Sequence, residues 1–159
     1  MRGLHGKIVD EILPRLAEKL KREGLISHYD RKQETIEISK DLPEIKINPD
    51  LILHTSNGKK ILIEVANPKD PKRFIGEVIY PKMLLCRKKI IADMVFILNP
   101  QEQGETHRRS LSEILMLDEV LTMPKGSKRV TWPGEDAAYG WLKAFVQYLE
   151  RDFSIEEQL

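Results

Sequence analysis

The dipeptide Asn57-Gly58 is the sequence feature that most restricts the fold of this chain. It separates two short apolar runs, and Asn-Gly between such runs strongly favours a tight β-hairpin. Asp50 comes directly before the first run, and Glu64 lies inside the second. A carboxylate in an apolar strand is costly to bury unless a cation or a hydrogen-bond donor compensates its charge. The hairpin therefore brings the two acidic residues onto neighbouring strands.

The length of the hairpin loop decides whether the two carboxylates share a face of the sheet. With a two-residue loop, Asp50 lies opposite Val65 and points to the other side of the sheet from Glu64. With a three-residue loop that begins at Ser56, Asp50 lies directly opposite Glu64, and the Cβ atoms of such opposed residues are about 4.5–5.5 Å apart. We favour the three-residue loop because it gives both acids a common role, although the residues alone leave both registers open.

The composition narrows the classes of protein to consider. The 159 residues are 41% apolar and 32% charged, as is typical of a single soluble globular domain. The net charge of +1 means that any nucleic-acid binding would depend on local basic clusters. The single cysteine, Cys86, excludes an internal disulfide and favours the cytoplasm. No apolar run approaches the roughly 18 residues of a membrane span, and no phosphate-binding loop or nucleophile elbow is present.

Apolar periodicity predicts the order of helices and strands. In chain order, the expected elements are a helix over 4–22 that Pro14 kinks or splits, strands over 34–39, 45–54 and 59–66, a helix over 70–89, a central strand over 91–98 covered on both faces, a helix over 110–123, a short edge strand over 130–132 and a helix over 135–152. The buried stripe expected on the last helix is Ala138, Trp141, Leu142, Phe145, Val146 and Leu149. This order predicts an α/β fold with a mixed central β-sheet flanked by α-helices.

The pairs Pro49-Asp50 and Glu64-Val65, in this order of elements, resemble the motif of the PD-(D/E)XK nuclease superfamily. The resemblance implies a restriction-endonuclease-like fold. It covers about residues 5–98, which would form the core of one domain spanning 1–159, with a C-terminal helical part over about 106–153.

The resemblance also implies a site and an activity. Asp50 and Glu64 would bind Mg²⁺ or Mn²⁺, the backbone carbonyl of Val65 would complete the metal shell, and Glu11 on the first helix would assist. The expected activity is hydrolysis of DNA phosphodiester bonds through a metal-activated water. The basic residues that follow the second acid, Lys69, Lys72 and Arg73, are expected to contact DNA phosphates.

The family's motif lysine is missing from this chain. It would stand two residues after Glu64 on the same face of the strand, where the sequence has Ala66. Loss of one such electrostatic donor can lower a rate by about 10²–10³-fold. Lys82 lies on the inward stripe of the expected helix over 70–89, so we take it as the substitute catalytic cation. Lys69 and Lys72 are nearer to Glu64 in the sequence and are alternatives for this role.

Other functions stay open. Without the lysine, the chain could be a catalytically inactive nuclease-fold protein that binds nucleic acid or a protein partner. Its C-terminal aromatic residues, Trp132, Trp141 and Phe153, would then serve a homodimer interface. A third reading is an α/β domain with an unrelated role. The four histidines have no zinc-like spacing, and His54 is expected to be exposed near the hairpin tip.

Overall fold

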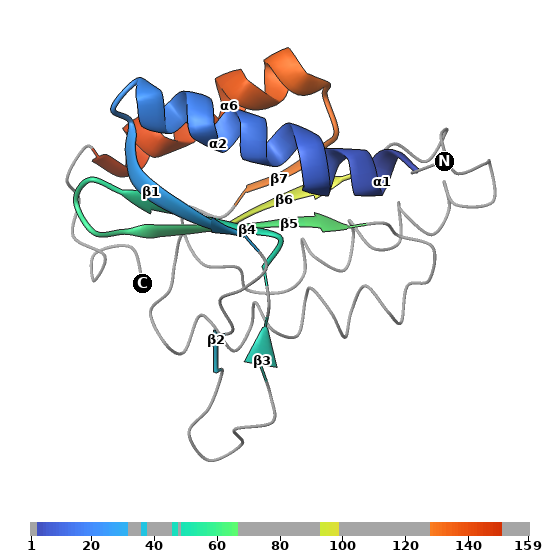
Figure 1. Cartoon of the computed structure of the whole chain (residues 1–159), viewed down its shortest axis with the longest axis horizontal. Helices are drawn as coiled ribbons and strands as arrows, with labels where there is room; N and C mark the ends of the chain where they lie inside the picture. The colour runs from blue at the N-terminus through green and yellow to red at the C-terminus, as the bar shows by residue number, and fades with distance from the viewer. Residues whose placement is uncertain are drawn as a thin grey trace.

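A computed structural model describes residues 3–31, 36–37, 46–47, 49–66, 93–98 and 128–150. Over these residues the chain forms a five-stranded mixed sheet with helices on one face (Figure 1). The strands are β1 (Ile26–Arg31), β2 (Ile36–Glu37), β3 (Lys46–Ile47), β4 (Leu51–Thr55), β5 (Lys60–Ala66), β6 (Asp93–Ile97) and β7 (Lys128–Thr131). The sheet order is β1-β4-β5-β6-β7, while β2 and β3 pair separately. The β1/β4 and β4/β5 pairs are antiparallel and the β5/β6 and β6/β7 pairs are parallel, which confirms the predicted α/β class.

The N-terminal helix adapts to its internal proline. Helix α1 (Leu4–Lys7), a π-helical segment (Ile8–Ile12) and helix α2 (Leu13–Arg22) follow one another without a gap. Pro14 has no N–H, so the Asp10 carbonyl, four residues earlier, lacks its usual helical donor. Arg31 Nη2 on β1 donates to that carbonyl at 3.3 Å. The irregularity predicted at Pro14 therefore takes the form of a π-helical turn, a common site of helix bending.

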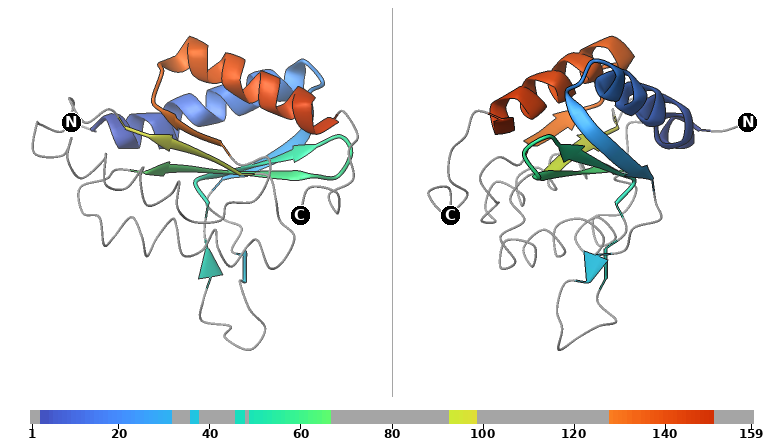
Figure 2. Two further views of the ribbon diagram at one scale, coloured as in Figure 1. Left: turned by 180° about the vertical axis from the view of Figure 1, so that it is seen from behind. Right: turned by 60° about the vertical axis from the view of Figure 1, so that its left-hand side comes forward.

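Helix α6 (Glu135–Glu150) lies beside α2 on the same face of the sheet (Figures 1 and 2). Arg15 of α2 donates to Glu135, and Tyr139 of α6 donates to Glu23 at the end of α2. The predicted helix over 135–152 is confirmed for its described part, but Trp141 is 45% exposed and was wrongly expected in the core. None of the described helices is both long and apolar enough to cross a membrane.

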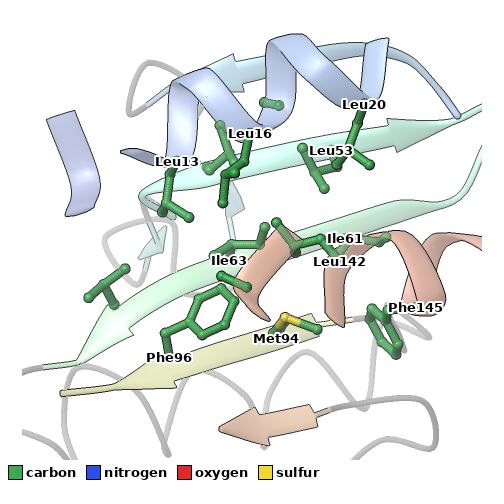
Figure 3. Packing of buried hydrophobic residues seen from close by; sticks show 14 of the residues in the cluster. Leu13, Leu16, Leu20, Leu53, Ile61, Ile63, Met94, Phe96, Leu142 and Phe145 are labelled. Atoms are coloured by element: carbon green, nitrogen blue, oxygen red, sulfur yellow. The ribbon is translucent and has the colours of Figure 1, made fainter. Parts of the chain in front are cut away.

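The main core lies between these helices and one face of the sheet, called here the helix-packed face (Figure 3). Strand alternation turns every second side chain toward the helices. The sheet residues in this core include Leu51, Leu53, Ile61, Ile63, Val65, Met94 and Phe96. The intervening residues point to the opposite face and are also buried: Ile52, Leu62, Ala66, Val95 and Ile97. The expectation of a β6 strand covered on both faces is therefore confirmed.

Two strand predictions needed correction. Strand β1 was missed because Ile26 is its only buried residue, so it lacks the apolar pattern of a strand. The strand expected over 45–54 is divided into β3 and β4. Strand β7 lies at the sheet edge, as predicted for 130–132. The helices expected over 70–89 and 110–123 fall outside the described residues.

Candidate metal-binding sites on one face of the sheet

The hairpin loop between β4 and β5 has three residues. The Thr55 N–H donates to the Lys59 carbonyl at 2.9 Å, and His54 pairs with Lys60. Gly58 has φ +84°, a conformation that glycine adopts without the penalty of a side chain. Of the two loop lengths left open by the sequence, the structure has the three-residue one.

This register brings the two predicted acidic residues to the end of the β4/β5 ladder. Leu51 pairs with Ile63 as the last pair of the β4/β5 ladder, and Asp50 and Glu64 are the next residues on the two segments. Glu64 alternates with the buried Leu62, so its side chain belongs to the opposite face of the sheet. Asp50 and Glu64 are each partly exposed. Their role as metal ligands stays a prediction.

Both main-chain polar groups of Val65 are bonded to side chains at this point. Asp50 Oδ2 accepts a hydrogen bond from the Val65 N–H at 2.9 Å. His5 Nε2 lies 2.9 Å from the Val65 carbonyl oxygen, and since a carbonyl only accepts, this nitrogen carries the proton. The side chain of Asp50 and helix α1 therefore meet at the residue that follows Glu64.

Sequence reasoning did not single out His5 as part of this site. A signal was present, because His5 lies three and four residues before Ile8 and Val9, which are both buried. Residues with this spacing share one face of a helix. His5 therefore belongs to the inward stripe of the N-terminal helix, and its contact with β5 follows from that position.

The other predicted site residues are placed as follows. Glu11 lies in the π-helical segment and is exposed. Ala66, which occupies the motif lysine position, is 5% exposed on β5. The predicted catalytic lysine and the predicted DNA-binding residues lie outside the described residues: Lys82, Lys69, Lys72 and Arg73.

A second polar cluster, which the sequence reasoning missed, lies on β1 and β4. One ligand atom from each of His28, Asp30 and His54 falls within 4.8 Å of the others, so the group could hold a metal ion. His54 Nε2 lies 2.6 Å from Asp30 Oδ2, and the two imidazole rings stack with centroids 3.8 Å apart. The His54 side chain is only 14% exposed, which corrects the expectation that it is solvated.

The missed cluster depends on pairing between strands. His28 and Asp30 alternate on β1, and β1 itself was not predicted. His28 pairs with His54, and Asp30 pairs with Ile52, so the cluster belongs to the same face of the sheet as Glu64. Comparison of the chain with protein-family models, curated proteins and solved structures finds no match.

Proposed function

We propose that this chain is a metal-dependent nuclease-like protein of the PD-(D/E)XK type that hydrolyses DNA phosphodiester bonds. The observation that supports the proposal is the hairpin register, whose last pair, Leu51 with Ile63, directly adjoins Asp50 and Glu64 on neighbouring antiparallel segments. Hard divalent cations such as Mg²⁺ are typically held by one or two carboxylates together with waters and substrate phosphate oxygens. A cytoplasmic location is part of the proposal, since the single cysteine suits a reducing compartment.

In this proposal the main chain of Val65 positions Asp50 and contributes a metal ligand. The Val65 N–H orients the Asp50 carboxylate, which has up to four acceptor positions and so retains capacity for a cation. The Val65 carbonyl holds His5 through one lone pair and would offer the second to Mg²⁺ or Mn²⁺. When bound, such a cation lowers the pKa of a coordinated water and neutralises charge on the scissile phosphate.

The proposed cationic residues complete the assignment. Lys82 would stabilise the charge that develops on the phosphate in place of the missing motif lysine. Lys69, Lys72 and Arg73 would neutralise neighbouring DNA phosphates. Glu11, an exposed acid on the N-terminal helix, would assist in holding the metal.

Plasmid cleavage with Mg²⁺ or Mn²⁺ tests the activity. Asp50→Asn and Glu64→Gln preserve side-chain shape, and we expect each to lower the cleavage rate by about 100-fold or more, since loss of a ligand should exceed the ~10–100-fold typical of an outer partner. Asp136→Asn is the matched control, because Asp136 is an exposed acid in the first turn of α6. Equal cleavage by the wild type and both site variants would refute the catalytic proposal.

A specific observation favours a second candidate function. Ala66 is almost fully buried on the same face as Glu64, so β5 presents no cation where the motif requires one. The chain would then be a catalytically inactive nuclease-fold module that binds nucleic acid or a protein, with a homodimer as one form. DNA retention in a gel, or a dimer by light scattering, combined with no Mg²⁺ binding by calorimetry, would establish this alternative.

Ala66→Lys separates the two functions further. In an active but weak site, the restored lysine should raise cleavage by up to about 10²–10³-fold. Ala66→Met adds similar length without charge and controls for the bulk that the buried position must accept. If both variants fold and neither cleaves, the inactive module is favoured.

A further inference from the structure

We propose that His28, Asp30 and His54 form a second metal site, for a divalent transition metal of the Zn²⁺ type. Two imidazoles with one carboxylate form a donor set suited to Zn²⁺, whereas a site of oxygen donors alone suits Mg²⁺. The three ligand atoms already lie within 4.8 Å of one another. The ligand chemistry therefore distinguishes this cluster from the acidic pair.

The histidine cluster and the acidic pair are too far apart to form one two-metal catalytic site. His54 and Asp50 are four residues apart along the same segment. At roughly 3.3 Å per residue, this separation is about 13 Å. The ions of a two-metal catalytic site are about 3.5–4 Å apart. The histidine cluster is thus an independent site near the hairpin tip.

A bulge in β1 places His28 in the cluster. Ile26 pairs with Thr55, and the register then shifts so that His28 pairs with His54. Without the shift, His28 would pair with Leu53 and point into the helix-packed core. β-Bulges commonly re-aim a side chain in this way. The irregular register therefore brings both imidazoles to one face.

Ser27 sets the proton position on the His28 ring. The Ser27 hydroxyl donates its only proton to the His54 carbonyl, at 3.2 Å. Toward His28 Nδ1, at 3.0 Å, the same oxygen must therefore accept, so Nδ1 carries a hydrogen. In the neutral ring this leaves the Nε2 lone pair for a metal. Metal-bound histidines usually have such an outer partner on the second ring nitrogen.

A metal would take the place of the proton between His54 and Asp30. Their ligand atoms are 2.6 Å apart, whereas two ligands on a tetrahedral Zn²⁺ at about 2.0–2.2 Å are separated by roughly 3.3 Å. The pair therefore has to open by less than about 1 Å. Asp30 is 41% exposed and can move outward, while the largely buried His54 stays in place.

The His28 ring also has to tilt when the metal binds. A ligating lone pair lies in the plane of its imidazole, and the two rings are now nearly parallel, with an angle of 11° between them. His28 is exposed, so its ring can turn toward the ion without disturbing the core. Three protein ligands leave one tetrahedral position for water. The ion would cross-link the edge strand β1 to β4.

Calorimetric titration of the full chain with ZnCl₂ tests the proposal. The Asp50→Asn/Glu64→Gln double variant serves as the background, so that zinc bound at the acidic pair does not contribute. We expect one Zn²⁺ per chain. His28→Ala, at an exposed position, should weaken binding by more than about 100-fold, and Ser27→Ala should weaken it by about 10–100-fold. His107→Ala removes a histidine elsewhere in the sequence and should leave zinc affinity unchanged.

Further readouts separate this site from the proposed nuclease site. Bound Co²⁺ should show the visible absorption of a tetrahedral site in the same background, and Zn²⁺ should raise the melting temperature of that double variant but not of the same variant with His28→Ala added. Equal zinc affinity in the double variant with and without His28→Ala, when both are correctly folded, would overturn the proposal. Zinc binding that disappears in the Asp50→Asn/Glu64→Gln background would overturn it as well. Neither result bears on cleavage with Mg²⁺.

Discussion

The two faces of the sheet are both buried, yet they carry different residues. On β4 and β5 the helix-packed face is mostly aliphatic, with Leu51, Leu53, Ile61, Ile63 and Val65 in the core, and its one buried polar residue, Thr55, bonds to the hairpin loop. On the opposite face of the same strands, apolar residues alternate with His54 and Glu64. Stability alone favours apolar residues on both faces, because buried polar groups need partners. The polar face is therefore where function is expected, and the apolar face is where the fold is held together.

Truncation of one residue on each face gives the largest expected effect. Leu53 on the helix-packed face is fully buried, and its neighbour Ile52 on the opposite face is 1% exposed. We expect Leu53→Ala and Ile52→Ala each to lower the free energy of unfolding by about 2–5 kcal/mol, measured by urea denaturation. Gln147→Ala, at an exposed position on α6, should change it by less than about 0.5 kcal/mol. A much smaller loss of unfolding free energy for Ile52→Ala would contradict the burial of both faces.

Asp50 allows structural and metal-binding roles to be measured separately. Asp50→Ala leaves the buried Val65 without the acceptor for its N–H, which should cost about 1–3 kcal/mol of unfolding free energy. Asp50→Asn keeps an acceptor oxygen, so its loss of stability should be smaller. Both variants should lose Mg²⁺ binding in calorimetric titration. If Asp50→Asn binds Mg²⁺ as the wild type does, Asp50 is only a structural partner of β5.

The acidic pair was predictable from the sequence because a hairpin is a local structure. The turn residues limit the loop to a few lengths, and each length determines which residues face each other. The choice between two and three residues could not be made locally. In the structure the Thr55 hydroxyl accepts a hydrogen bond from the Lys59 N–H and donates one to the Lys59 carbonyl. These bonds across the loop stabilise the three-residue form. Once this length is known, it follows that Asp50 and Glu64 adjoin the last pair of the ladder.

The histidine cluster could not be predicted because it depends on contacts between distant segments. Strand β1 has one buried residue, so its place in the sheet comes from pairing with β4 and not from its own pattern. The bulge that turns His28 toward His54 is likewise a property of the pair. His5 is an intermediate case, since its helical spacing was visible but its partner, the Val65 carbonyl, was not. Long-range pairing is what the sequence pattern leaves unspecified.

The smallest expected effect concerns the helical layer that covers only the apolar face. Tyr139 on α6 donates a hydrogen bond to Glu23 at the end of α2. Partial burial and this hydrogen bond raise the pKa of Tyr139 to about 12 from an ordinary value of 10.0. The bond from Tyr139 also lowers the pKa of the Glu23 carboxyl below 4.5, although partial desolvation opposes this shift.

The two shifts predict the pH dependence of stability and its sign. The raised pKa of Tyr139 means that its contribution is complete below pH 10 and is lost as the pH rises from 10 toward about 12. The lowered pKa of Glu23 means that its contribution is present above pH 4.5 and is lost on acidification. Tyr139→Phe should therefore flatten the stability profile at both ends, measured by urea denaturation across pH. Because this contact lies among the helices, the variant should bind Mg²⁺ and Zn²⁺ as the wild type does. A change in either metal affinity would show that the two faces are coupled.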